Sequence, residues 1–194
     1  TALENFEPLK GTKVYDENDE LITQLHVERR LFVPLSEIPK TLQDALIRYH
    51  RRADDLWVRA VDDAGAVIDP TPDLYDLAFV LFALAAAHRV LQDERALPLA
   101  RSTLAAIEAR MADPVHGGWQ EGLPPVLPRP QNPDMHMLEA LLAWQAVAPD
   151  PTFEAAARRV LDLFATRFFD REHLMLGEFF SADWTAAPGG AGQV

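Results

Sequence analysis

Apolar and charged residues separate onto two faces of a helix near the C-terminal end of the chain. Between Pro151 and Phe168 the apolar residues recur at spacings of three and four, and they are Phe153, Ala156, Ala157, Val160, Leu161, Phe164, Ala165 and Phe168. Charged side chains take the opposite face, which is typical of an amphipathic helix that buries one side. Asp150 is a fitting N-cap, and Pro151 suits the first helical position.

Three further segments have helical periodicity. The spacing predicts a second amphipathic helix over Arg95–Ala112, with an apolar stripe at Leu97, Ala100, Leu104, Ile107 and Met111. Asp73–Leu91 and Asp134–Val147 are apolar around most of their circumference. We therefore expect these two helices to be buried on more than one side.

The four helices form a repeat with an offset of 57 residues, which places Leu81 on Leu138, Leu104 on Leu161, Asp113 on Asp170 and Glu121 on Glu178. Each unit is an apolar inner helix, an amphipathic outer helix, and a closing loop that contains an acidic residue. Such a hairpin cannot bury its inner helix alone and must stack on neighbours. The predicted fold class is therefore mainly α, a partial α/α toroid of helical hairpins. The same offset predicts a preceding outer helix over Thr41–Ala60.

The first 47 residues have a different pattern. Thr12–Tyr15 and Leu21–Val27 read as half-buried strands, the second with the alternation of period two that such strands show. All three lysines lie in the first forty residues, whereas every basic residue after Lys40 is arginine. We therefore predict two parts of separate origin, a strand-rich segment over residues 1–47 and an incomplete helical domain over residues 48–194.

Part of the first segment resembles a known family. The stretches Thr12–Asp16, Glu20–Ile22, Val27–Pro39 and Leu42–Ile47 are similar to the segment just before the glycosyltransferase domain of bifunctional class A penicillin-binding proteins. In that family the next residues are a Glu-Asp pair and an aromatic-rich run, which carry the catalytic glutamate. Arg48–Arg52 stands there in this chain. The resemblance implies ancestry for residues 1–47 and no activity.

Composition and charge narrow the function further. The 194 residues carry a net charge of −12 and no cysteine. No nucleic-acid partner is expected, because that partner needs a basic face, and cysteine-ligated zinc is excluded. The longest apolar run, Leu77–Ala87, has eleven residues, whereas a helical membrane span needs about 20. With no signal-peptide pattern at the start, we expect no membrane contact and a cytoplasmic protein.

Four ordered motifs lie in the helical part, at Asp73–Ala86, Gly117–Glu121, Gln131–Ala140 and Gly177–Trp184. Together they are similar to the N-acylglucosamine 2-epimerase family, which includes cellobiose 2-epimerases and isomerases of the mannose isomerase type. The resemblance implies an (α/α)6 barrel that acts on free or simply substituted sugars. It also implies proton transfer through an enediol or enolate, without a metal or a redox cofactor.

The resemblance implies a set of sugar-contacting residues at the barrel mouth. Tyr75, Asn132 and His136 match such positions, and His136 is the predicted catalytic residue. Gln131, from the same motif as His136, is a further predicted substrate contact. Trp184 is predicted to stack on a sugar ring, with a packing role as the alternative for a tryptophan in a loop.

Histidine suits this reaction on chemical grounds. Moving a proton between C1 and C2 of a sugar needs a group with a pKa near neutral. His136 and Glu139 are three residues apart and share a helix face, so a half-buried histidine paired to Glu139 is the alternative role. Two ligands on one turn make a weak metal site without a third, and no metal is predicted.

The predicted function is a sugar epimerase or aldose–ketose isomerase that transfers a proton through His136 on a small sugar. The family's main acid–base histidine and its glutamate belong to a motif that would follow Val194, so we expect this chain to be inactive by itself. Two alternatives stay open. An incomplete toroid exposes apolar helix faces, which favours an assembly module that forms homo-oligomers. Residues 1–47 favour a role in peptidoglycan synthesis.

Overall fold

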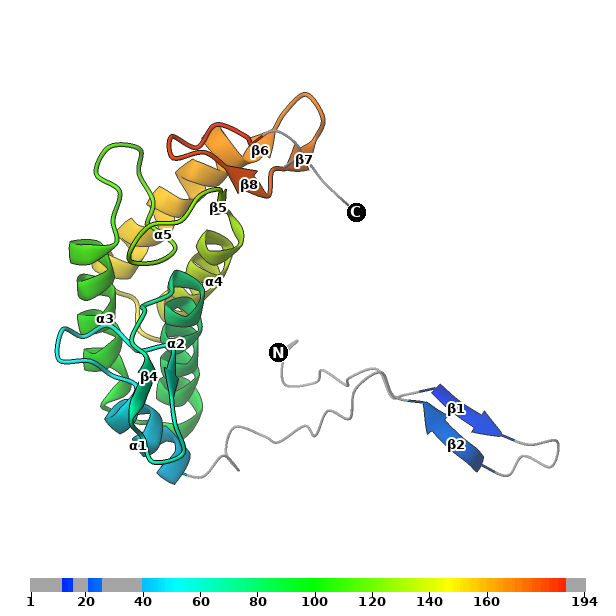
Figure 1. Cartoon of the computed structure of the whole chain (residues 1–194), viewed down its shortest axis with the longest axis vertical. Helices are drawn as coiled ribbons and strands as arrows, with labels where there is room; N and C mark the ends of the chain where they lie inside the picture. The colour runs from blue at the N-terminus through cyan, green and yellow to red at the C-terminus, as the bar shows by residue number, and fades with distance from the viewer. Residues whose placement is uncertain (1–11, 16–20, 26–39, 188–194) are drawn as a thin grey trace. The chain divides into compact units, whose positions relative to one another are not determined.

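The computed structural model describes residues 12–15, 21–25 and 40–187, and its contacts divide the chain into two units, Thr1–Pro34 and Leu35–Val194. The described part of the first unit is an antiparallel pair of strands, β1 (Thr12–Tyr15) and β2 (Leu21–Leu25) (Figure 1). Both strands are those predicted, while residues 26 and 27 of the second prediction lie outside the described residues. The separate origin of residues 1–47 stays a prediction.

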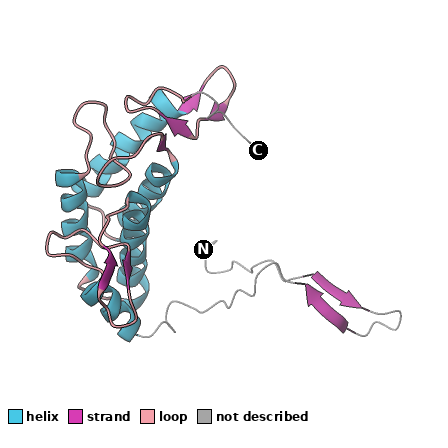
Figure 2. Ribbon diagram, in the orientation of Figure 1, coloured by secondary structure: helices cyan, strands magenta, loops and turns pink. Residues whose placement is uncertain are grey.

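The second unit is built mainly from helices (Figure 2). α2 (Leu74–Ala86) continues into the π-helical turn η2 (Ala87–Leu91), α3 spans Ala96–Arg110, α4 spans Asn132–Val147, and α5 (Pro151–Leu163) continues into η3 (Phe164–Phe168). The four predicted helices are therefore confirmed, and their ends differ from the prediction by two residues at most.

Two aspartates fix where helices begin. Asp73 accepts a hydrogen bond from the backbone N–H of Asp76 at 3.2 Å, and Asp150 accepts one from the N–H of Thr152 at 2.8 Å. Each bond satisfies a donor that the first helical turn leaves free. Asp150 is the N-cap that the sequence predicts, and Arg101 donates to its other oxygen at 2.8 Å, which ties α3 to the start of α5.

The helix predicted over Thr41–Ala60 is wrong in its second half. α1 spans Lys40–Tyr49, and the chain then makes a tight turn, closed by an antiparallel bridge between Arg51 and Trp57, which carries Leu56 and Trp57 into the core. Trp57 explains the change, because its buried indole N–H donates to the Thr103 hydroxyl at 3.0 Å. A short hairpin follows, β3 (Ala60–Val61) with β4 (Val67–Asp69).

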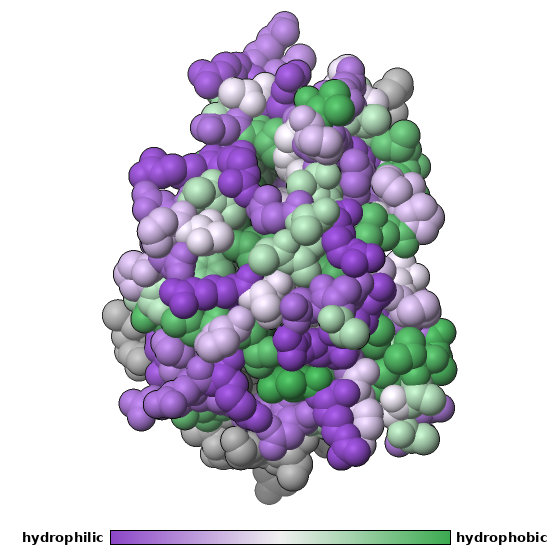
Figure 3. Space-filling view, turned by 90° about the vertical axis from the view of Figure 1, so that its left-hand side faces the viewer, coloured by the Kyte–Doolittle hydropathy of each residue, from purple (hydrophilic) through white to green (hydrophobic). Residues whose placement is uncertain are grey.

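The core lies between two layers of helices, with α2 beside α4 and with α3 and α5 packed against them. Trp144 of α4 is fully buried, stacks on Phe153 with ring centroids 5.3 Å apart, and donates to the Leu81 carbonyl at 2.9 Å. Seen from the side on which α3 lies in Figure 1, polar side chains are interleaved with smaller apolar patches (Figure 3). α2 is buried on two sides, as expected, and exposes a third.

The 57-residue offset is preserved in the hydrogen bonds, which extends the repeat from sequence to geometry. The Leu74 N–H donates to the Glu121 carbonyl at 2.8 Å, and the equivalent Gln131 N–H donates to the Glu178 carbonyl at 3.0 Å. The turns after the outer helices match as well: the side chain of Asp113 accepts from the N–H groups of Val115 and His116, and that of Asp170 accepts from Glu172 and His173.

Each closing loop therefore returns to the start of its own inner helix. Bridges join Asp73 to Gly122 in the first hairpin and Pro130 to Phe179 in the second. The second bridge belongs to the strand pair β5 (Arg129–Pro130) and β8 (Phe179–Phe180), and a further pair, β6 (Phe169–Asp170) with β7 (Met175–Leu176), precedes it. This closure places both loops at the N-terminal ends of α2 and α4.

Candidate functional site

Three aromatic rings meet between the first turns of the two inner helices. The His136 ring of α4 lies edge-on to Tyr75 of α2, with centroids 4.9 Å apart, and 4.8 Å from Phe79. Tyr75 and Phe79 contact each other at 4.9 Å, and both remain exposed by about two fifths. The structure thus brings together two of the residues that the sequence singles out, on a face open to solvent.

Glu139 holds the His136 ring from the next turn of α4. The Nδ1 atom of His136 lies 2.8 Å from a carboxylate oxygen of Glu139, and the histidine side chain is 19% exposed. An ionised carboxylate can only accept a hydrogen bond, so in the neutral ring Nδ1 carries the proton and Nε2 keeps its lone pair. Nε2 is therefore the nitrogen that can take up a proton.

Asn132 and Gln131 lie at the beginning of the same helix. Asn132 is the first residue of α4, is exposed, and stands one turn before His136, so the two share a helix face. Asn132 is also the repeat equivalent of Tyr75, so both side chains occur at the same end of the inner helices. Gln131 is half-buried, and its side-chain oxygen is buried without a hydrogen-bond partner.

Trp184 lies in a packed position instead of on this open face. It is 2% exposed, contacts Phe168 with centroids 5.0 Å apart, and donates its indole N–H to the Gly117 carbonyl at 2.9 Å. The guanidinium carbon of Arg129 covers the ring at 3.5 Å from its centroid. A ring covered in this way has no free face for a sugar, so the structure favours the packing role for Trp184.

The sequence analysis missed Arg129, which is buried at 2% exposure and joins three segments. It donates to the Asp113 carboxylate at 2.9 Å, to the Trp119 carbonyl at 2.8 Å and to the Ala182 carbonyl at 2.9 Å. A buried arginine with these partners is a charge-assisted anchor for the loops beside α4. Its repeat equivalent is Pro72, so the 57-residue offset gives no signal for it.

Two carboxyl groups near Arg129 are unusually hard to ionise. Burial raises the pKa of Asp134 to about 7, with a further increase from the charge of Glu121, while Arg129 opposes both effects. Burial likewise raises the pKa of Glu121 to about 7, Arg129 opposes this shift, and Asp73 adds to it. The pKa of Asp76, at the start of α2, is raised mainly by burial and then by Asp73, against the opposing charge of Arg59.

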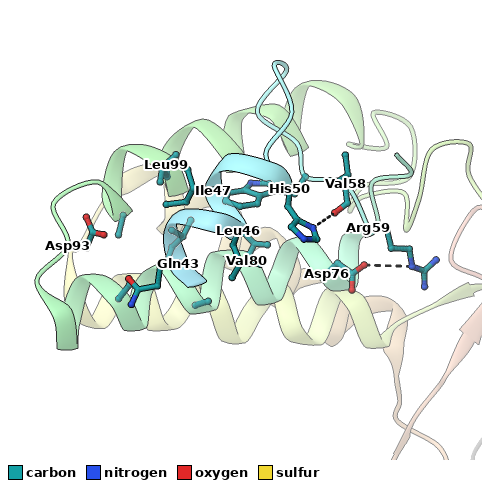
Figure 4. A pocket seen from close by; sticks show the side chains of 15 residues that line it. Gln43, Leu46, Ile47, His50, Val58, Arg59, Asp76, Val80, Asp93 and Leu99 are labelled. Atoms are coloured by element: carbon teal, nitrogen blue, oxygen red, sulfur yellow. Dashed lines mark hydrogen bonds and ion pairs between the residues drawn. The ribbon is translucent and has the colours of Figure 1, made fainter. Parts of the chain in front are cut away.

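A cavity of about 230 Å³ lies elsewhere, between α1, α2 and the start of α3 (Figure 4). Its polar contacts are His50 with the Val58 carbonyl, at 3.2 Å, and Arg59 with Asp76, at 3.8 Å. The residues of α2 and η2 that line it are Asp76, Val80, Ala83, Leu84 and Ala87. The 57-residue offset maps them onto the α4 residues Pro133, Met137, Ala140, Leu141 and Trp144, all buried. The equivalent face of α4 packs against α2, so the repeat indicates that a further inner helix would pack against α2 at this cavity.

Metal binding and membrane insertion are the two remaining kinds of site that the described residues bear on. Within residues 12–15, 21–25 and 40–187, no three or more His, Asp or Glu side chains gather as a metal ion would require. Leu74–Leu91 is apolar enough to cross a membrane by length and composition, with mean hydropathy 1.6. This is weak evidence for a span, because the core helix of a soluble protein passes the same test.

Comparison with solved structures identifies the fold class. A cellobiose 2-epimerase from Spirochaeta thermophila DSM 6192 aligns with a TM-score of 0.68 and 27% identity, over 75% of this chain and 40% of that one. A D-mannose isomerase aligns with a TM-score of 0.65 at 22% identity, over 73% of this chain and 38% of that one. The fold is therefore part of an α/α toroid, as the repeat predicts.

Comparison of sequences gives the family. Residues 41–193 match the N-acylglucosamine 2-epimerase (GlcNAc 2-epimerase) family, and the chain belongs to it. A mannose-6-phosphate isomerase from Rhizobium meliloti (strain 1021) is 38% identical over 134 residues, and a D-mannose isomerase from Thermobifida fusca is 31% identical over 135. Each match takes 67% of this chain but only 34% and 33% of the relatives, so the chain spans about a third of their length.

Proposed function

We propose that this chain supplies one wall of the sugar site of an aldose epimerase or aldose–ketose isomerase. The observation that carries the proposal is the contact between Tyr75 and His136, with Glu139 bonded to Nδ1 of the histidine. The similarity to a mannose-6-phosphate isomerase and a D-mannose isomerase supports a small aldose as the substrate. A cytoplasmic location belongs to the same proposal, supported by the similarity to sugar epimerases and isomerases.

Each residue of the wall has a proposed task. The reaction moves a proton between two neighbouring carbons of the open-chain sugar, and Nε2 of His136 is the group that accepts or returns it, or that binds the sugar oxygens while the proton moves. Asn132 and Tyr75 hydrogen-bond the sugar hydroxyls from the same end of the helices. Glu139 keeps the imidazole in the tautomer that leaves Nε2 unprotonated.

Sugar binding tests this proposal. We expect mannose to shift the NMR signals of residues around His136 in the full chain, and His136→Ala to abolish the shifts. His173→Ala is the matched control, because His173 is also bonded through Nδ1 to an acid three residues away, Asp170, at 2.8 Å. Mannose binding that survives His136→Ala would contradict the proposal.

Turnover is a separate measurement. The second acid–base group of the family is not among the motifs of this chain, so we expect no conversion of mannose by the chain alone. Conversion that is lost in His136→Ala would show that the wall described here is sufficient for catalysis, contrary to this expectation.

A second candidate function is an assembly module, and a specific observation favours it. Residues on the α4–α5 edge are exposed although their repeat equivalents are buried: Leu142 is 49% exposed against 2% for Ala85, and Leu161 is 47% exposed against 0% for Leu104. Apolar side chains in this position are stabilised when a further hairpin covers them. Light scattering at increasing concentration measures whether copies of the chain associate, and a monodisperse monomer would rule this function out.

A further inference from the structure

The two inner helices carry matching sets of residues on one side. At spacings of four and then three, the 57-residue offset maps Tyr75, Phe79 and Phe82 of α2 onto Asn132, His136 and Glu139 of α4. Residues with this spacing share a helix face. The aromatic set and the polar set therefore occupy equivalent positions, and Phe79 is the equivalent of the histidine.

Phe79 is exposed although it belongs to a helix whose other faces are buried. Its side chain is 43% exposed, whereas its neighbours Leu77 and Ala78 are each 1% exposed. A phenylalanine in the core contributes through full burial, which Phe79 does not have. Its position is explained better by the two rings that it contacts.

Tyr75, Phe79 and His136 form a closed triangle of rings. The centroids lie 4.9 Å apart for Tyr75 and Phe79, 4.9 Å for Tyr75 and His136, and 4.8 Å for Phe79 and His136. The imidazole plane makes angles of 88° with Tyr75 and 48° with Phe79, within the range of orientations that aromatic pairs favour over a face-to-face stack. A turn of the imidazole about its own axis therefore disturbs both contacts at once.

Glu139 by itself restrains the imidazole only weakly. Its carboxylate lies 2.8 Å from Nδ1 of His136, but the glutamate side chain is 59% exposed. An exposed pair on one helix contributes little, because water competes for both groups and the long side chain loses rotamer freedom. The contact with Phe79 comes from the neighbouring helix, so it restrains the ring independently of Glu139.

We propose that Phe79 is a positioning residue for His136, and that its ring holds the imidazole in the orientation in which Nδ1 donates to Glu139 and Nε2 stays unprotonated. Tyr75 contacts the imidazole from the same helix, but its hydroxyl already has a proposed task on the sugar. Phe79 has no polar atom, so orientation is the task that its contacts support. The orientation of the ring does not rest on the proposed function, whereas its consequence for mannose binding does.

NMR of the nitrogen-labelled full chain measures the tautomer of His136, because protonated and unprotonated ring nitrogens give separate signals. Spectra are recorded at about pH 9, where histidine rings are neutral, and His136→Ala identifies the signals of this residue. We expect the tautomer with the proton on Nδ1 to dominate in the wild type. Phe79→Leu keeps an apolar side chain but removes the ring. It should lower the ratio of this tautomer to the other about two- to tenfold, the factor that corresponds to one aromatic contact.

Two further variants serve as controls. Phe79→Tyr keeps the ring and should keep the wild-type ratio. Phe82→Leu is the matched control, because Phe82 is 42% exposed on the same side of α2 and lies one turn further along the helix. Leucine at the half-exposed position 79 should leave the unfolding free energy nearly unchanged. If Phe79→Leu does not fold, Phe79→Met gives the same test, and failure of both to fold would make Phe79 a core residue and overturn the proposal.

The outcomes separate the claims. A tautomer ratio that is unchanged in Phe79→Leu overturns the positioning role, and so does an equal change in Phe82→Leu. In NMR titrations with mannose, we expect the affinity to fall about two- to tenfold in Phe79→Leu and to stay at the wild-type value in Phe79→Tyr. A lower affinity with an unchanged tautomer ratio would make Phe79 a direct sugar contact and overturn positioning. A changed ratio, in a chain whose wild type binds no mannose, supports positioning and overturns the proposed function.

Discussion

At the scale of single residues, Arg129 has the largest predicted effect on stability. Replacing it by methionine keeps most of the volume but leaves Asp113 buried without its ion pair and frees two backbone carbonyls. Removing one partner of a buried pair costs about 3–5 kcal/mol. We expect a loss of that size in the free energy of unfolding, measured by urea denaturation.

Arg158→Met is the control for Arg129→Met. Arg158 is exposed and bonds only to Glu154, four residues earlier on the surface of α5. Exposed pairs of this type contribute about 0.3–0.5 kcal/mol. Equal losses for the two variants would show that Arg129 does not act as an anchor.

Burial of the Glu121 and Asp134 carboxyls gives the chain an unusual dependence of stability on pH. The folded-state pKa values of Glu121 and Asp134, both about 7, lie above the ordinary values of 4.5 and 3.8. The folded chain therefore binds more protons than the unfolded chain between about pH 4 and 7, and stability falls as pH rises through this window. Burial raises the pKa of Asp134 from 3.8 to about 7, so Asp134→Asn should remove about 4 kcal/mol of that decline. Urea midpoints measured across the window check this, and an unchanged slope in the variant would contradict it.

The sequence predicts the residues proposed to contact the sugar, but it does not predict the residue that anchors the loops beside them. Tyr75, Asn132 and His136 occur inside motifs, and helical spacing alone places His136 beside Glu139. Arg129 acts through contacts with segments far from it in the chain, such as its hydrogen bond to the Ala182 carbonyl. No local pattern encodes such contacts. For the same reason the sequence leaves both a stacking and a packing role open for Trp184, whereas in the structure the Arg129 guanidinium covers its ring.

At the scale of elements, the helices follow from periodicity and the short strands do not. Each of the four long helices carries apolar residues over several turns, and aspartate caps mark the starts of α2 and α5. The pairs β3–β4, β5–β8 and β6–β7 have two or three residues per strand, too few to show an alternation. The pair β5–β8 forms because the closing loop returns to the start of α4, whereas β3–β4 and β6–β7 join segments only a few residues apart. A tertiary contact also explains why α1 is shorter than predicted, since Trp57 is held in the core by its hydrogen bond to Thr103.

The N-cap of α5 gives a prediction at this scale. Asp150 satisfies the Thr152 N–H and also receives Arg101 from α3. Asp150→Ala should cost about 1–2 kcal/mol of stability, because it removes a cap and one partner of a half-buried ion pair. Asp150→Asn keeps a capping oxygen, so its loss should be smaller. Thermal unfolding of both variants measures the difference, and an equal loss would assign the effect to the ion pair alone.

At the scale of the whole molecule, the repeat indicates where further hairpins belong. The cavity beside α2 and the exposed edge of α4 and α5 are the two ends of one arc, since each carries residues whose repeat equivalents are covered elsewhere. The chain covers 40% of the cellobiose 2-epimerase that it resembles. Within the described residues, apolar side chains line the cavity at one end of this arc and are exposed at the other.

Association through the α4–α5 edge can be separated from stability by substitution. Leu142 is half exposed, so Leu142→Asp should leave the unfolding free energy nearly unchanged. If a second copy covers the edge, the same substitution leaves the core of each chain intact but places a buried charge in the contact between the two copies. Burying a leucine contributes about 1.5–3 kcal/mol, so the dissociation constant should rise about tenfold or more.

Leu174→Asp is the control, because Leu174 is 75% exposed in the loop between β6 and β7. Sedimentation equilibrium compares the three chains, and equal association of the two variants would place the contact somewhere other than this edge.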